Sequence, residues 1–210
     1  MKINKRNLSM LLLASALGAH AQKSIKAPEG GKPISSELIG IFFEDISSSA
    51  DGGLYAELLQ NGSFEFNLSE RDGWGAGTAW RVIRPGHSLG LIQNLQQDPI
   101  HPNNPNYMRL QVERTKEFYD YKGWKGFGLE NHGFDGITVK KGARYDFSVF
   151  ARNIDRTAKQ ARVTLVAPGK EEKILADTIL TIDSNQWKQF GCTLEPNADC
   201  PNAMLRFLIL

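Results

Sequence analysis

The most informative segment of the sequence is LIGIFFEDI, residues 38–46. Residues 38–43 form an almost unbroken apolar run, which predicts a strand buried on both faces in a parallel sheet. Glu44 and Asp45 end this run. In an α/β barrel the active site is built at the C-terminal ends of the strands, so a carboxylate in this place is expected to meet substrate. Glu44 is therefore a candidate functional residue.

A short helix is expected after this strand. Asp51 suits its N-cap, Leu54 and Leu58 fall on one face, and Gly62 suits the left-handed residue that ends a helix. Strand and helix together make one βα unit within residues 22–62. A complete barrel repeats this unit eight times over about 250 residues, and nothing after residue 62 repeats the pattern. The unit is therefore predicted to be the first piece of an incomplete TIM barrel.

From residue 63 onward the pattern changes to short segments of alternating polarity, separated by Gly, Pro, Asn and Asp. Such segments predict half-buried antiparallel strands, and their number and short spacing predict a jelly-roll β-sandwich over residues 63–210. The predicted fold class is therefore mainly β. The expected strands are 108–112, 145–149, 162–166, 174–176, 178–182, 187–194 and 204–210.

The sequence ends on AMLRFLIL, residues 203–210, which has the pattern of a strand without a closing turn or polar tail. At the edge of a sheet such a strand would expose a long apolar surface, a liability that native sheets avoid. We therefore expect the sequence to be cut short at its C-terminus.

Residues 1–21 have the pattern of an export signal. Three basic residues precede an apolar stretch over residues 10–19, and small residues mark a cleavage site near Ala21. The apolar stretch is shorter than the roughly 20 residues that a membrane-spanning helix needs. The protein is therefore predicted to be bacterial and either periplasmic or secreted, with no membrane span.

The charge balance argues against some partners. The whole chain holds 25 basic and 23 acidic residues, and without residues 1–21 there remain 22 basic and 23 acidic ones. A near-neutral chain without a basic cluster does not favour nucleic acid or an anionic membrane, whereas neutral sugars remain a natural class of ligand. The sequence has no glycine-rich phosphate loop after a strand and no histidines spaced for a metal, so neither a cofactor nor a metal site is predicted.

Two cysteines, Cys192 and Cys200, lie in the exported part of the chain. In an oxidising compartment they could form a disulfide that staples the loop between the last two strands. Two unpaired thiols are the other interpretation. The sequence leaves both open.

Two segments resemble known families. Residues 34–46, 50–58 and 61–65 resemble the amino-terminal signature of α-L-arabinofuranosidases of glycoside hydrolase family 51. Residues 61–74, 139–152 and 187–190 are similar to carbohydrate-binding modules of the family 4 and 9 type. Together the two resemblances cover nearly the whole chain after residue 21. They imply that the first strand of a barrel comes near the start of the sequence. In this arrangement a jelly-roll module follows that strand, and the remaining barrel strands follow the module.

The first resemblance implies a reaction. Enzymes of that family hydrolyse terminal α-L-arabinofuranosyl groups with retention of configuration, which needs two carboxyl groups only about 5 Å apart. Adjacent side chains on one strand point to opposite faces, so Glu44 and Asp45 cannot form this pair. The family's catalytic glutamates lie on later strands, and Glu44 matches a position that hydrogen-bonds the arabinose ring. The resemblance thus implies no catalytic residue here, a substrate-binding Glu44, and a chain that is inactive alone.

The second resemblance implies a glycan partner, and plant cell-wall polysaccharides or oligosaccharides are expected. Exposed aromatic rings stack on the apolar faces of sugars. The candidate glycan-binding residues lie in a segment rich in Gly and Asn, and they are Tyr119, Tyr121, Trp124 and His132. The alternative is that aromatic residues fill the sandwich core, which we favour for Trp74, Phe147, Trp187 and Phe190.

Other functions are also compatible with this sequence. A stand-alone, non-catalytic carbohydrate-binding protein would use residues 23–62 as a packing extension, and a surface adhesion sandwich without glycan specificity is a third interpretation. Neither explains a strand and helix patterned for a barrel. The resemblance further implies that the full-length enzyme forms a homo-oligomer.

Overall fold

The computed structural model describes residues 57–115, 125–155 and 157–210. The described residues fold mainly into antiparallel β-strands, with one 3-10 turn, η1 (Pro85–His87). The mainly β fold class predicted from the sequence is confirmed. Most of the predicted βα unit, including Glu44, lies outside the described residues. No helix in the described part of the chain is long and apolar enough to cross a membrane.

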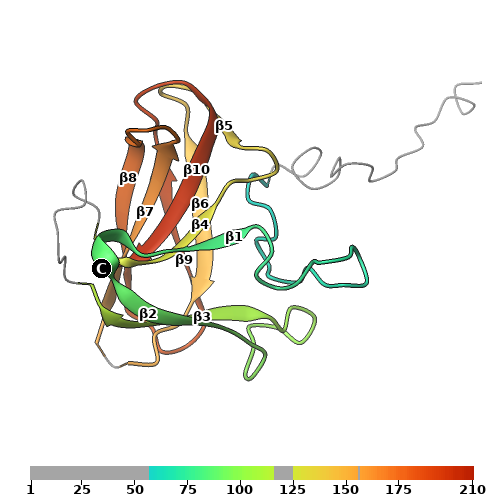
Figure 1. Cartoon of the computed structure of the whole chain (residues 1–210). Coiled ribbons are helices and arrows are strands. Elements are labelled where there is room, and N and C mark those ends of the chain that lie inside the picture. Colours follow the sequence, from blue (N-terminus) through green and yellow to red (C-terminus); the bar gives the residue numbers. More distant parts are fainter. Residues whose placement is uncertain (1–56, 116–124, 156) are drawn as a thin grey trace, which may run out of the picture. The chain divides into compact units, whose positions relative to one another are not determined.

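The largest sheet has six strands, all of them antiparallel to their neighbours. Its main path runs β1 (Trp80–Ile83), β4 (Phe127–Asn131), β10 (Cys200–Ile209), β7 (Lys159–Ala167) and β8 (Lys173–Ile182). The short strand β5 (Ile137–Val139) pairs with one end of β10. Figure 1 shows β8, β7 and β10 side by side.

Two further ladders complete the described fold. Strand β6 (Tyr145–Ala151) pairs with β9 (Lys188–Leu194), and β2 (Leu89–Leu95) pairs with β3 (Tyr107–Arg114). Along β6 every second residue is half-buried, and the residues between them are exposed. One face of β6 and β9 therefore packs on the core, as the alternation of polar and apolar residues predicts.

The main core lies between the six-stranded sheet and the β6–β9 ladder. It contains Val163 and Leu165 from β7, Leu205 from β10 and Leu194 from β9, all nearly inaccessible to solvent. Phe147 and Phe190, which the sequence placed in the core, pack against this cluster. The two tryptophans assigned to the core behave differently. Trp74 stacks on Phe66, with ring centroids 4.2 Å apart, and Trp187 lies against Tyr107.

Several strands agree with the sequence and others were not foreseen. The expected strands at 108–112, 145–149, 162–166 and 187–194 correspond to β3, β6, β7 and β9. The two short strands expected at 174–176 and 178–182 form one continuous strand, β8. The sequence analysis did not predict β1, β2, β4 or β5.

The apolar strand at residues 203–210 does not lie at an edge of the sheet. Strand β10 lies between β4 and β7 and pairs with both, so its backbone groups are bonded on each side. The apolar residues of this strand are explained by its central place in the sheet.

The helix end predicted at Gly62 is wrong. Residues 60–63 form a turn, and Asn61 within it is left-handed, with φ of 53°. The Asn61 side chain donates to the carbonyls of Ala76 and Thr78 at 3.0 and 2.9 Å. Asn side chains tolerate the left-handed region and bond locally to the backbone, which explains the choice of residue.

Candidate functional site

A row of polar side chains crosses the main path of the six-stranded sheet at one register. Its members are paired across adjacent strands, and from β1 to β8 they are Arg81, Glu130, Arg206, Thr164 and Asp177. We call these five residues the polar row. On β10 the neighbours Leu205 and Phe207 contact the main core. Because side chains alternate along a strand, Arg206 and the rest of the row lie on the opposite face.

Apolar residues flank the polar row on this face. Met204 and Leu208, on either side of Arg206, form a small second cluster with Val166, and Ile83 of β1 packs against it. Asp177 at the β8 end is held by Arg162, which donates from Nε and Nη2 at 2.7 and 2.8 Å. Hydrogen bonds from Arg162 lower the pKa of Asp177 and outweigh the effect of its burial.

Glu130 lies in the row between Arg81 and Arg206, and its side chain is fully buried (0% exposed). Arg206 donates from Nε to Glu130 Oε2 over 2.5 Å, and Arg81 donates from Nη2 to Oε1. His132 places Nε2 at 2.8 Å from the same Oε1. A buried carboxylate is costly unless it is paired and hydrogen-bonded, and here the two oxygens share three partners.

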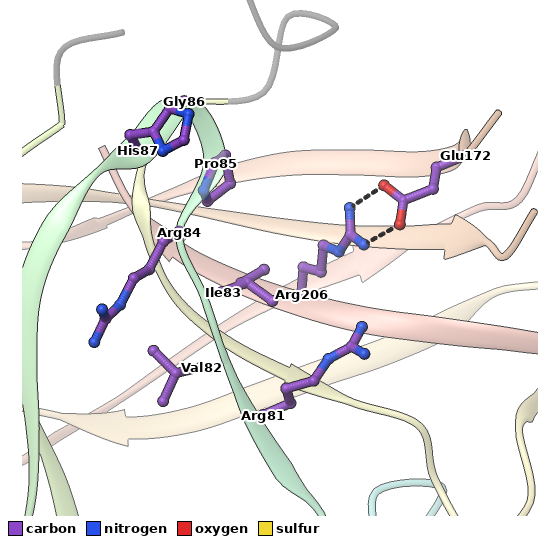
Figure 2. Close-up of a pocket in the computed structure, with 9 residues that line it drawn as sticks. All are labelled: Arg81, Val82, Ile83, Arg84, Pro85, Gly86, His87, Glu172 and Arg206. Carbon is purple, nitrogen blue, oxygen red and sulfur yellow. Dashed lines mark hydrogen bonds and ion pairs between the residues drawn. The ribbon is translucent and has the colours of Figure 1, made fainter. Parts of the chain in front are cut away.

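The second carboxylate at this place is Glu172. Arg206 donates from Nη1 and Nη2 to its two oxygens at 2.8 and 2.6 Å, which is the bidentate geometry of a guanidinium and a carboxylate. Figure 2 shows Arg206 turned toward Glu172, while the side chain of Arg84 points away from both. Arg206 therefore links two carboxylates and is itself buried, with 7% of its side chain exposed.

These contacts determine the protonation of Glu130. Burial by itself would raise its pKa, but the hydrogen bonds from His132 and Arg206 and the charges of Arg206 and Arg81 outweigh burial and lower the pKa. For Arg206, burial lowers the pKa, whereas the bonds to Glu172 and Glu130 raise it above its usual value. Both groups are therefore charged at neutral pH. Glu130 is fixed as a hydrogen-bond acceptor and is not a proton donor.

Two open hollows lie beside the polar row. The first has a volume of about 450 Å³, and its lining includes Arg81, Ile83, Pro85, Glu172 and Arg206. The second has a volume of about 480 Å³, and its lining includes His132, Phe134, Asp135, Pro168 and Met204. Both combine charged side chains with apolar carbon, as sites for polar organic ligands do.

His132 is the only candidate glycan-binding residue from the sequence that falls in the described part of the chain. It borders the second hollow, half of its side chain is exposed (50%), and its ring contacts Glu130. Tyr119, Tyr121, Trp124 and the substrate-binding candidate Glu44 lie outside the described residues. Their roles stay predictions.

Sequence reasoning missed Arg81, Glu130, Glu172 and Arg206. One signal was available, because Arg206 is a single charge within the apolar strand at residues 203–210. A charge inside a central strand is retained only where a partner is provided. The partner Glu130 could not be identified in this way, because β4 itself was not predicted.

A second polar cluster joins the first residue of β3 to the residues that follow β6 and precede β9. The guanidinium of Arg152 lies 4.7 Å from the ring centroid of Trp187 and 5.6 Å from that of Tyr107. Arg152 also pairs with Asp98, while Trp187 donates to the Asp98 carbonyl at 3.0 Å. These contacts hold the loop between β2 and β3 against the β6–β9 ladder.

Both cysteines are free thiols in this structure. Cys192 lies on β9 and Cys200 begins β10, so the two belong to strands of different sheets. The Cys200 thiol lies 3.5 Å from Asn202 Oδ1. Burial, together with the charge of Asp146, raises the pKa of the Cys192 thiol, which disfavours the reactive thiolate.

Comparison with known proteins finds relatives that are named as α-L-arabinofuranosidases. No family model matches the chain. The chain is 37% identical over 123 residues to an extracellular exo-α-L-arabinofuranosidase of Streptomyces chartreusis, covering 58% of the chain and 13% of that protein. It is 28% identical over 188 residues to α-L-arabinofuranosidase 1 of Arabidopsis thaliana, covering 84% of the chain and 25% of that protein.

A solved structure agrees with these relatives. The arabinose-bound structure of a family 51 α-L-arabinofuranosidase superposes with a TM-score of 0.61 and 28% identity, over 80% of this chain and 26% of that one. The homologues of this chain are thus α-L-arabinofuranosidases of glycoside hydrolase family 51, over part of its length. The chain spans between 13% and 25% of the curated relatives described here.

Proposed function

We propose that this chain is the N-terminal portion of an exported, retaining α-L-arabinofuranosidase that removes terminal α-L-arabinofuranosyl groups from arabinoxylan or arabinan. One observation carries the proposal: the similarity to α-L-arabinofuranosidases extends over 84% of the chain, so it includes the sandwich as well as the N-terminal signature. Among the relatives, the Streptomyces protein is described as extracellular, which supports export of this protein too.

The described residues do not supply the catalytic pair in this proposal. A retaining glycosidase needs a carboxylic acid with a raised pKa and a nucleophilic carboxylate about 5 Å away. Glu130 and Glu172 both bind Arg206, but the pKa of Glu130 is lowered, and both carboxylates are held in ion pairs. A carboxylate in this state cannot protonate a leaving group. The catalytic glutamates are therefore assigned to barrel strands that follow this chain in the complete enzyme.

Residues 22–62 provide the first βα unit of the barrel in this proposal. Glu44 ends the apolar strand pattern, where barrel enzymes place residues that meet substrate. We assign it hydrogen bonds to hydroxyls of the arabinose ring. The sandwich over residues 63–210 is assigned the role of an accessory domain that contacts the polysaccharide.

Hydrolysis by the complete protein tests this proposal. The complete enzyme, with the chain extended by the remaining barrel, is expected to release 4-nitrophenol from 4-nitrophenyl α-L-arabinofuranoside and to leave the matched β-D-xylopyranoside almost untouched. The 210-residue chain alone is expected to release none. Preference of the complete protein for another glycoside, or activity of the chain alone, would contradict the proposal.

A stand-alone carbohydrate-binding protein is the second candidate. It is favoured by the separate core of the described sandwich, which is built from β5 to β10. The two candidates differ in the gene that encodes the chain. An open reading frame that continues with further βα units supports the enzyme, whereas a stop codon soon after the codon of Leu210 supports the free module.

A further inference from the structure

We propose that the two hollows beside the polar row form one groove that binds a neutral oligosaccharide through Arg81, Glu172 and His132. The inference rests on the proposed function for the class of ligand, since it concerns a glycan. It adds a specific binding surface on the face of the sheet that points away from the main core. His132 was already a candidate from the sequence, whereas Arg81 and Glu172 are charged residues that the sequence analysis did not assign to glycan binding.

The two hollows are neighbours on the same face of the sheet. Arg206 lines the first and Met204 lines the second, and the two residues lie about 7 Å apart along β10 because each residue of a strand advances about 3.3 Å. The segment between β7 and β8 borders both hollows, with Pro168 at the second and Glu172 at the first. Consecutive sugar units can therefore occupy neighbouring hollows.

Charge balance selects a neutral ligand. Arg206 contacts two carboxylates, Glu130 and Glu172, so its positive charge is already compensated. Asp135 lies at the second hollow. Three arginines and three carboxylates lie in or beside the two hollows, so these charges balance; they are Arg81, Arg84, Arg206, Glu130, Glu172 and Asp135. An anionic ligand would meet these carboxylates, whereas hydroxyl groups can accept from the guanidinium and donate to the carboxylate. Vicinal hydroxyls of a sugar match such neighbouring donors and acceptors.

The exposed groups of the groove are available for contact. Arg81 has 62% of its side chain exposed although its Nη2 is bound to Glu130, and His132 is half-exposed in the same way. Ile83 and Pro85 add apolar carbon at the first hollow, and Phe134 adds it at the second. Apolar carbon of this kind suits the C–H face of a sugar ring, and each hollow lies within the roughly 300–1,000 Å³ of typical ligand sites.

Glu130 is the positioning residue of this groove. It is fully buried and does not reach the ligand, but it binds Arg81 and Arg206 on the first side and His132 on the second. Fixing these side chains before binding lowers the entropy that association would cost. This one carboxylate thus holds the hydrogen-bond donors of both hollows in place.

Titration of the 210-residue chain with a neutral arabinoxylan-derived oligosaccharide tests the groove. Isothermal titration calorimetry measures the dissociation constant for the wild type, for Arg81→Ala and for His132→Ala. Each substitution is expected to raise the dissociation constant about tenfold, the typical loss for one hydrogen bond to a charged group. Arg144→Ala removes an exposed arginine that precedes β6 and lies outside the groove, and it should leave binding unchanged.

Glu130→Gln tests the positioning role. It keeps the shape of the side chain and removes its charge, so it is expected to weaken binding more than either single contact variant. Circular dichroism and the melting temperature show whether the variant is folded. Should it fail to fold, Arg81→Ala and His132→Ala still decide, because both side chains are largely exposed.

The outcomes are distinct. Absence of binding, equal binding by the groove variants, or tighter binding of an oligosaccharide that carries uronic acids would overturn the inference. If the complete enzyme is active but its sandwich does not bind the oligosaccharide, the groove proposal is refuted and the proposed function is not affected. A chain that binds through the groove, within a complete protein that cleaves no arabinofuranoside, would refute the proposed function alone.

Discussion

The buried ion pairs of the polar row depend on one another. Glu130 has three basic neighbours, and Arg206 is shared between Glu130 and Glu172. Removing one member of such a network leaves the other charge buried without its partner, which costs more than the pair itself contributes. The network therefore makes the β4–β10 pairing specific, because another register of β10 would separate Arg206 from Glu130.

Substitution of Glu130 by Gln is expected to destabilise the sandwich. Breaking a buried ion pair by removing one partner costs about 3–5 kcal/mol, because here Arg206 keeps a buried charge. Chemical denaturation followed by tryptophan fluorescence measures the free energy of unfolding. Glu195→Gln, at an exposed position after β9, is the matched control and should be within about 0.5 kcal/mol of wild type. A Glu130→Gln variant as stable as this control would contradict the assignment.

The same carboxylate predicts a dependence of stability on pH. The pKa of Glu130 is lower in the folded chain than that of an ordinary glutamate. The ionised carboxylate therefore contributes stability that is fully present above the unfolded pKa of about 4.3, and that is lost as the pH falls through the folded value. Asp177 has a lowered pKa and acts in the same direction.

Melting temperatures between pH 7 and pH 3 measure this effect. The wild type is expected to lose stability on acidification, and Glu130→Gln should lose less, with Asp177 accounting for part of what remains. An identical decrease in melting temperature in both proteins would show that Glu130 does not contribute to the dependence of stability on pH.

At the scale of elements, β4 and β10 determine where the polar row forms. Gly128 is the second residue of β4 and pairs with Ile83 of β1 on one side and Leu208 of β10 on the other. A Cβ atom at this position would lie 1.9 Å from the carbonyl oxygen of Phe207. The close approach of the two backbones therefore requires glycine here.

Gly128→Ala is expected to cost about 3 kcal/mol or more, since a methyl group has to displace backbone atoms of the central strand. Gly75→Ala is the matched control, because a Cβ atom there meets no atom within 4 Å. The measurement is the free energy of unfolding of both variants. Equal stability of the two variants would mean that β4 and β10 can move apart without a loss in the free energy of unfolding, and it would contradict the need for glycine here.

Sequence pattern located several strands of this fold and missed others. Strands β3 and β6 follow a period of two and were located within a few residues. Strand β4 is buried at all five positions and contains a glycine and a glutamate, so neither period nor propensity revealed it. The last strand was recognised, but its central place depends on β4 and β7, which a local pattern cannot show.

The candidate site shows a similar division at the level of single residues. His132 was identified because it lies among glycines and asparagines, a composition that signals a loop. Glu130, only two residues away, was missed because its importance arises from partners on β1 and β10. Contacts between residues that are distant in the sequence are set by sheet topology, which one sequence alone does not specify.

At the scale of the whole molecule, the described sandwich is one part of a larger enzyme in our proposal. The homologous enzymes are four or more times longer than the aligned region, since the chain covers at most 25% of the curated relatives described here. The sandwich offers a groove for a glycan chain, and the barrel would supply the two catalytic carboxylates. Binding and hydrolysis are then expected to respond to different substitutions.

The most direct test of the central claim is the kcat/KM of the complete enzyme for 4-nitrophenyl α-L-arabinofuranoside, with Glu44→Gln compared with wild type. If Glu44 bonds hydroxyls of the arabinose ring, the value should fall about tenfold to a hundredfold, the loss of a charged hydrogen bond in the transition state. Glu70→Gln, an exposed residue of the described part, should leave it unchanged. Full activity of Glu44→Gln would contradict the claim that residues 22–62 belong to an arabinofuranosidase barrel.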